Sequence, residues 1–132
     1  MNKQIHILFA DDDADDRELF CKALNEFDPE IHCHTVHDGY ETLAYLKDPA
    51  NILPDYIFLD FRMPKMSGKQ CLEEIRKDER LKDIPVIIYT TSDDVDESIE
   101  LAESGATHFV TKPENPEEIY YLISMVLTEK WT

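Results

Sequence analysis

Short apolar runs alternate along this chain with segments whose apolar residues recur at helical spacing. Five runs have the length and composition of buried strands: 5–10, 31–36, 56–59, 85–90 and 108–111. Four large side chains in a row, as in 56–59 between Pro54 and Pro64, are typical of a strand covered on both faces. Each run is followed by an amphipathic helical pattern. We therefore predict an α/β fold with a doubly wound, five-stranded parallel sheet.

Local signals indicate where the helices begin and end. Asp13 is a candidate N-cap for the first helix, and the acidic residues that follow it suit the positive end of the helix dipole. Asn115-Pro116-Glu117-Glu118 has the cap, proline and glutamate of a strong helix start. Gly105 is expected to end the fourth helix. Without an internal repeat or a linker, residues 1–132 are expected to form one domain with no separate output domain.

Composition narrows the classes of function. The net charge of −16 argues against direct nucleic-acid binding, because phosphates would be repelled. No apolar run approaches the roughly 18 residues of a membrane span, and no signal peptide is evident. A cytoplasmic protein without membrane insertion is the expectation. Cys21, Cys33 and Cys71 are odd in number and lie in apolar-periodic segments, so buried free thiols in a reducing compartment are predicted.

Polar residues that can support chemistry follow four of the five predicted strands. These residues are Asp11 and Asp12, Asp60, Thr90, and Lys112. Since the carboxyl ends of parallel strands meet in one crevice, we expect these side chains to converge. Clustered carboxylates repel one another or bind a cation, and hard oxygen ligands suit Mg²⁺. An aspartate nucleophile at position 60 beside Mg²⁺, a lysine and a hydroxyl would form a phosphoryl-transfer site.

Four separate segments in this order resemble the receiver domain of bacterial two-component response regulators. They are Ile7-Leu8-Phe9-Ala10-Asp11-Asp12-Asp13, Leu59-Asp60-Phe61-Arg62-Met63-Pro64-Lys65-Met66-Ser67-Gly68, Tyr89-Thr90 and Thr111-Lys112-Pro113. The resemblance covers essentially the whole chain and implies the (βα)5 flavodoxin-like receiver fold. It also implies a chemotaxis-regulator-like, stand-alone protein that catalyses only its own phosphorylation and dephosphorylation. The charged connection 77–85 resembles that of stand-alone receivers related to phytochrome-associated regulators.

The resemblance assigns a role to each residue of the expected crevice. Asp60 would accept phosphate from a histidine kinase or a histidine phosphotransfer protein. Mg²⁺ would be bound by Asp12, Asp60 and the backbone carbonyl of Arg62, with Asp11 acting mainly through water. Thr90 and Lys112 would hold the phosphoryl group, and Phe109 would be the switch aromatic that follows Thr90.

The same resemblance implies a cis peptide at Lys112-Pro113. Four positions depart from or tune the family pattern. Thr91 stands where alanine is usual, Glu114 stands where phenylalanine is usual, and Arg62 with Ser92 would influence the lifetime of the acyl phosphate. Phosphorylation would bias the face formed by the fourth helix, the fifth strand and the fifth helix, and the output would pass to an unknown downstream protein. A homodimer would form through the last two helices.

Two other functions, a phosphatase and a nucleotide-binding module, fit the sequence less well. A small haloacid-dehalogenase-type phosphatase would use Asp11 of the Asp-x-Asp sequence, but Ala14-Asp15 does not match that family and the chain leaves no room for a cap. A nucleotide-binding module would need a glycine-rich turn after the first strand, and glycine occurs only at 39, 68 and 105.

The histidines raise the question of a structural metal. His32 and His34 would share one face of their strand, but the sequence places no further ligand beside them or His37. Surface or helix-packed histidines are therefore the expectation.

Overall fold

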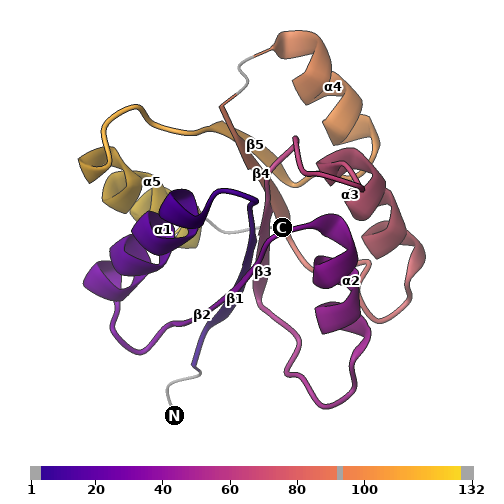
Figure 1. The fold of residues 1–132 in the computed structure, drawn as a ribbon, viewed down its shortest axis with the longest axis horizontal. Coiled ribbons are helices and arrows are strands. Elements are labelled where there is room, and N and C mark those ends of the chain that lie inside the picture. Colours follow the sequence, from indigo (N-terminus) through magenta and orange to yellow (C-terminus); the bar gives the residue numbers. More distant parts are fainter. Residues whose placement is uncertain (1–3, 92–93, 129–132) are drawn as a thin grey trace.

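The structure is a computed structural model that describes residues 4–91 and 94–128. Strands and helices alternate throughout: β1 (His6–Ala10), α1 (Ala14–Phe27), β2 (His32–Val36), α2 (Gly39–Lys47), β3 (Tyr56–Leu59), α3 (Gly68–Lys77), β4 (Val86–Thr90), α4 (Val95–Glu103), β5 (His108–Thr111) and α5 (Glu117–Thr128). All strands are parallel and form one sheet in the order β2-β1-β3-β4-β5 (Figure 1). The predicted doubly wound sheet is confirmed.

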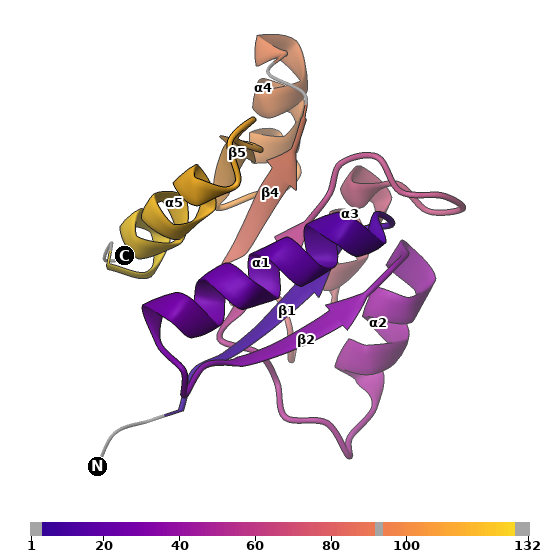
Figure 2. The ribbon, with the colours of Figure 1, turned by 60° about the vertical axis from the view of Figure 1, so that its left-hand side comes forward.

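The helices cover both faces of the sheet. Helices α1 and α5 lie on one face and α2 and α3 on the other, as both ribbon views show (Figures 1 and 2). Alternate residues of each strand enter opposite layers: Ile7 and Phe9 pack with α1 and α5, whereas Leu8 and Ala10 pack with α2, α3 and Leu101 of α4. Burial on both faces explains why β1, β3 and β4 are nearly continuous apolar runs, whereas the edge strands β2 and β5 carry exposed polar residues.

The predicted helix starts agree with the structure. The Asp13 carboxylate accepts the backbone N–H groups of Asp15 (2.8 Å) and Asp16 (3.2 Å). The Asn115 side chain accepts the N–H of Glu117 at the start of α5. Asp94 caps α4 in the same way, and Gly105 follows that helix with φ of 109°. The expectation for Ser92 concerns a residue outside the described part of the chain.

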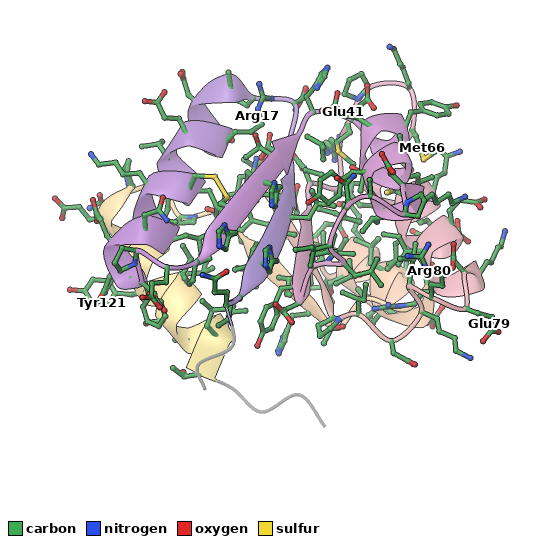
Figure 3. The ribbon with its side chains drawn as sticks, turned by 90° about the horizontal axis from the view of Figure 1, so that it is seen from below. Arg17, Glu41, Met66, Glu79, Arg80 and Tyr121 are labelled. Carbon is green, nitrogen blue, oxygen red and sulfur yellow. A yellow bond between two sulfur atoms is a disulfide. The ribbon has the colours of Figure 1, made fainter. Side chains whose placement is uncertain are left out.

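The prediction of three free thiols was wrong. Cys21 of α1 and Cys33 of β2 are joined in a disulfide with a Cα–Cα distance of 5.8 Å (Figure 3). Periodicity placed each cysteine on an inward face, but it could not show that the two faces meet in the same layer. Cys71 on α3 is free and buried, and burial raises the pKa of its thiol to about 12. Among the described residues, no helix is both long and apolar enough to cross a membrane.

Candidate functional site at the carboxyl ends of the strands

The crevice lies where the chain reverses its winding direction. Strands β1 and β3 are neighbours in the sheet. From β1 the chain continues to β2 on one side of this pair, and from β3 it continues to β4 on the other side. A crevice for ligands opens at the carboxyl ends of two neighbouring strands that are connected in opposite directions in this way. Asp11 and Asp12 follow β1, and Asp60 follows β3. Oxygen atoms of all three carboxylates lie within 4.8 Å of one another. The predicted acidic cluster is therefore present.

Backbone hydrogen bonds hold the site residues one position beyond the regular strands. Asp60 N–H donates to the carbonyl of Ala10 (3.0 Å), and Asp11 N–H donates to that of Val36 (3.1 Å). Lys112 N–H likewise donates to the carbonyl of Thr90 (2.6 Å). Because the sheet continues to these residues, their side chains are positioned by rigid scaffold rather than by free loops.

Lys112 contacts carboxylates from three separate segments. Its Nζ lies 2.6 Å from Asp11 Oδ2, 2.9 Å from Asp16 Oδ2 and 3.2 Å from Asp60 Oδ2. The Lys112 side chain is only 9% exposed. Burial alone would lower the pKa of this amine, but the carboxylates outweigh burial and raise it above its usual range. Lys112 is thus a fixed cation in the crevice.

Asp11 is the most deeply buried of the three carboxylates. Burial raises the pKa of its carboxyl from 3.8 to about 6, although Lys112 and the N–H of Asp13 act in the opposite direction. Asp12 is exposed, whereas Asp60 is buried. The cluster therefore combines inner carboxylates with an outer one that faces solvent, and this donor set fits a Mg²⁺ ion that keeps several waters.

The other predicted site residues are distributed around this cluster. Thr90 is buried at the end of β4, and its backbone carbonyl accepts the N–H of Lys112. Phe109 is partly buried and packs against the layer that contains α3 and α4. Arg62 donates its N–H to Asp60 Oδ1 (3.2 Å), while its guanidinium reaches Glu97 of α4 (3.3 Å). Its carbonyl as a metal ligand stays a prediction.

One expectation for this region was wrong. Every described peptide bond is trans, including Lys112–Pro113. A Lys-Pro dipeptide permits either isomer, and the trans form agrees with the extended backbone that carries Lys112 from β5.

Asp16 is a site residue that the sequence analysis missed. It was interpreted only as an acidic residue of the first helical turn, which it also is. Its carboxylate, however, turns back to Lys112. Asp16 lies three residues after the N-cap Asp13, and this spacing directs a side chain toward the start of the helix. That signal could have identified it.

Gly68 holds the loop after β3 close to Asp60. Its N–H donates to the carbonyl of Phe61 (2.9 Å), and a Cβ at this position would lie 2.4 Å from the carbonyl oxygen of Asp60. Both contacts are with backbone, which cannot turn aside as a flexible side chain can.

Gly68→Ala is therefore expected to destabilise the fold by about 1 to 3 kcal/mol, since overpacking must shift the backbone that carries Asp60. Urea unfolding measures this change. Lys69→Ala is the control, because it removes only an exposed ion pair with Glu100 and should cost less than about 1 kcal/mol. Equal losses in the two variants would contradict the close contact.

Comparison with known proteins agrees with this geometry. The sequence profile of the response regulator receiver domain matches residues 7–124. The chain is 33% identical over 121 residues to the phosphate regulon transcriptional regulatory protein PhoB of Pseudomonas aeruginosa, covering 92% of the chain and 51% of PhoB. It is 30% identical to the two-component response regulator ORR5 of Oryza sativa subsp. japonica, covering 92% and 88%. The chain spans about half the length of PhoB.

Among solved structures, the phosphorylated cyanobacterial phytochrome response regulator RcpA is similar, with 29% identity and a TM-score of 0.87 over 94% of this chain and 91% of that one. The chain belongs to the response regulator receiver family of two-component signalling. Receiver domains take phosphoryl groups from histidine kinases, bind Mg²⁺ through an acidic cluster, and are regulators rather than enzymes in the usual sense.

The family assignment corrects two points. The haloacid-dehalogenase alternative through Asp11 is not supported. A bacterial source does not follow either, because a relative is found in rice.

Proposed function

We propose that Asp60 is the phosphoacceptor of this receiver. One observation carries the proposal: the buried Asp60 carboxylate lies within 3.2 Å of the Lys112 amine and beside Asp11 and Asp12. A carboxylate oxygen of Asp60 attacks phosphorus, forming an O–P bond as the N–P bond of a phosphohistidine breaks and its electron pair returns to the imidazole. The chemistry thus requires a free carboxylate and a cation for the transferred oxygens.

The remaining residues act on the phosphoryl group after transfer. Lys112 contributes positive charge and Thr90 a hydroxyl group toward its oxygens. Water then attacks phosphorus and returns the Asp60 carboxylate and inorganic phosphate, so the chain catalyses only its own phosphorylation and dephosphorylation. The direct test is incubation with Mg²⁺ and a small phosphodonor, which should add the mass of one phosphoryl group. Chelation of Mg²⁺ should prevent the addition.

Asp12 and Asp60, with the Arg62 carbonyl, would bind Mg²⁺, and Asp11 would act mainly through water. The ion would neutralise charge on the transferred oxygens. The donor set supports this assignment, because all the side-chain ligands are hard carboxylate oxygens at the edge of an open crevice.

Mg²⁺ is expected to stabilise the folded chain. At a concentration about ten times its Kd, the gain is about 1.4 kcal/mol, which raises Tm by about 3 to 5 °C for a domain of this size. Thermal unfolding with and without Mg²⁺ measures the gain. Asp12→Asn removes an exposed carboxylate, so it should leave the metal-free Tm nearly unchanged while abolishing the Mg²⁺ increment. An undiminished increment in this variant would contradict the ligand assignment.

The phosphodonor in the cell would be a sensor histidine kinase or a histidine phosphotransfer protein in the cytoplasm. RcpA is a phytochrome response regulator, and the connection 77–85 resembles that of related stand-alone receivers. Phytochrome-type kinases are therefore the first to include when phosphotransfer is profiled. The cognate kinase should phosphorylate this chain faster than the other kinases of the source organism.

The output surface would be formed by α4, β5 and α5. Thr90 and Phe109 connect the phosphoryl site to this surface, where large apolar side chains are exposed: Val95, Ile99, Tyr121 and Met125. A cavity of about 490 Å³ lies between β5 and α5, with Val110 and Tyr121 among its lining residues. We propose that residues 1–132 act through this surface on a downstream protein or on a second copy.

Beryllofluoride, which imitates the phosphoryl group, is expected to convert monomer to dimer in sedimentation velocity. Self-association would cover the apolar side chains of α5, because a two-fold interface brings the same patch of both copies together. Met125→Glu should block the dimer and preserve the fold, since Met125 is 64% exposed. A sedimentation coefficient that beryllofluoride leaves unchanged would remove the homodimer and leave the downstream protein as the occupant.

A further inference from the structure

Three histidines form a row on β1 and β2 that the receiver function does not use. His6 and His32 are register partners on the two strands, and His34 lies two residues farther along β2. The His6 ring lies 4.6 Å from that of His32 and 6.1 Å from that of His34, centre to centre, with the planes nearly parallel. The sequence suggests only His32, His34 and His37 as candidate ligands, because His6 is distant along the chain. The neighbouring strand provides the third imidazole that was missing.

The row is separate from the phosphoryl site. His6 begins β1, whereas Asp11 follows the last residue of that strand. The row therefore spans the amino-terminal half of β1 and the facing residues of β2, away from the crevice at the carboxyl ends of the strands. They share the sheet face of Leu8 and Val36, and the ring of Tyr45 on α2 lies 5.3 Å from that of His34. His37 is not a member, because it pairs with Glu41 on the surface.

The surroundings of the row favour the neutral form of His34 and leave a ring nitrogen of His6 available. The pKa of His34 is lowered, first by partial burial and then by the charge that His6 and His32 would carry. Buried Nδ1 of His6 has no hydrogen-bond partner in the described part of the protein. His32 Nε2 contacts the side-chain oxygen of Gln4 at 3.1 Å. A buried ring nitrogen without a partner costs free energy that a ligand would recover.

We propose that His6, His32 and His34 bind a borderline divalent transition metal, with Zn²⁺ as the representative ion. Three imidazoles with an open fourth position for water are an established zinc ligand set, and imidazole is preferred by Zn²⁺, Cu²⁺ and Ni²⁺ over Mg²⁺. Among the described residues only the aspartate cluster already brings three such ligand atoms within 4.8 Å of one another. The ring nitrogens of the three histidines must therefore come closer together to share one ion. Metal binding would turn the exposed rings of His32 and His34 out of the stack and toward His6.

The test is titration of the whole chain with Zn²⁺, using a competing indicator dye, and with Co²⁺, whose visible absorption reports coordination. One equivalent should bind in the presence of excess Mg²⁺. His32→Gln and His34→Gln should each weaken Zn²⁺ binding by at least about tenfold, the lower end of the loss seen even for residues that only support a ligand. Both side chains are exposed, so the fold should persist in these variants.

Two control variants separate the possible outcomes. His37→Gln removes a surface histidine outside the row and should keep the wild-type Zn²⁺ affinity. Asp12→Asn should also keep it, although this variant loses the Mg²⁺ response. Zn²⁺ binding that survives both His32→Gln and His34→Gln, or that is lost in Asp12→Asn, would overturn the proposal, as would failure of the wild-type chain to bind one equivalent.

Discussion

Asp60→Asn is expected to reduce phosphoryl incorporation from a small phosphodonor by more than about 100-fold, because the amide cannot act as the nucleophile. Asparagine has nearly the same shape as aspartate. It also keeps an oxygen that can accept the N–H of Arg62, so the loop after β3 should retain its conformation. Intact-mass measurement after incubation with Mg²⁺ and donor detects the incorporation.

Two further Asp→Asn variants make this result specific. Asp13→Asn changes an exposed carboxylate that caps α1, and asparagine caps helices equally well, so incorporation should be close to wild type. Asp11→Asn should reduce incorporation without abolishing it, since Asp11 is expected to act through bound water. Label that persists in Asp60→Asn and disappears in Asp11→Asn would contradict the assignment of the nucleophile.

Lys112→Met is expected to lower the free energy of unfolding by about 3 kcal/mol at pH 7 in chelator-containing buffer. Methionine is of similar length but carries no charge. The variant therefore leaves the carboxylates of Asp11, Asp16 and Asp60 in the crevice without their common cation. Urea unfolding measures the loss, and Mg²⁺ should restore part of it by supplying the missing positive charge.

The loss in Lys112→Met should shrink as the pH falls toward 5. The folded-state pKa of Asp11 is about 6 against 3.8 for an ordinary aspartate, so the cost of its ionisation to folding builds up between pH 3.8 and about 6 and is complete above that range. Acidification from pH 7 toward 5 relieves part of this cost. Without Lys112 this pKa rises further. The Lys112 contribution, in turn, is complete below pH 10.5 and is lost only as the pH rises through its raised folded-state pKa.

Lys77→Met is the matched control, because Lys77 is exposed and its one ion pair with a described residue is with Glu74, one turn away on α3. It should change the unfolding free energy by less than about 1 kcal/mol at either pH. A loss for Lys112→Met that is no larger than this, or that grows on acidification, would show that the three carboxylates do not depend on Lys112.

The fold could be predicted because burial on both faces leaves a clear record in the sequence. The inner strands β1, β3 and β4 are nearly continuous apolar runs, and the polar residue at the carboxyl end of each marks the edge of the sheet. The parallel arrangement then brings Asp60 next to Asp11, although 49 residues separate them. The site could be predicted because the carboxyl ends of parallel strands lie at the same edge of the sheet, and no distance was needed.

The remaining features depend on which side chains meet, and periodicity alone does not give that. Cys21 and Cys33 are each apolar-periodic, yet their pairing requires the position of α1 over β2. Asp16 is an acidic residue of the first turn of α1, and its contact with Lys112 depends on where β5 places that lysine. His6 was separated by 26 residues from its partner His32, and the β1–β2 register brings them together.

The most direct test of the central claim is to locate the phosphoryl group itself. After labelling with Mg²⁺ and a small phosphodonor, borohydride reduces an aspartyl phosphate to homoserine, which peptide mass spectrometry assigns to one position. The account predicts homoserine at position 60 alone, in the peptide that contains Phe61 and Arg62. Homoserine at position 11 or 12 with aspartate intact at position 60 would contradict it.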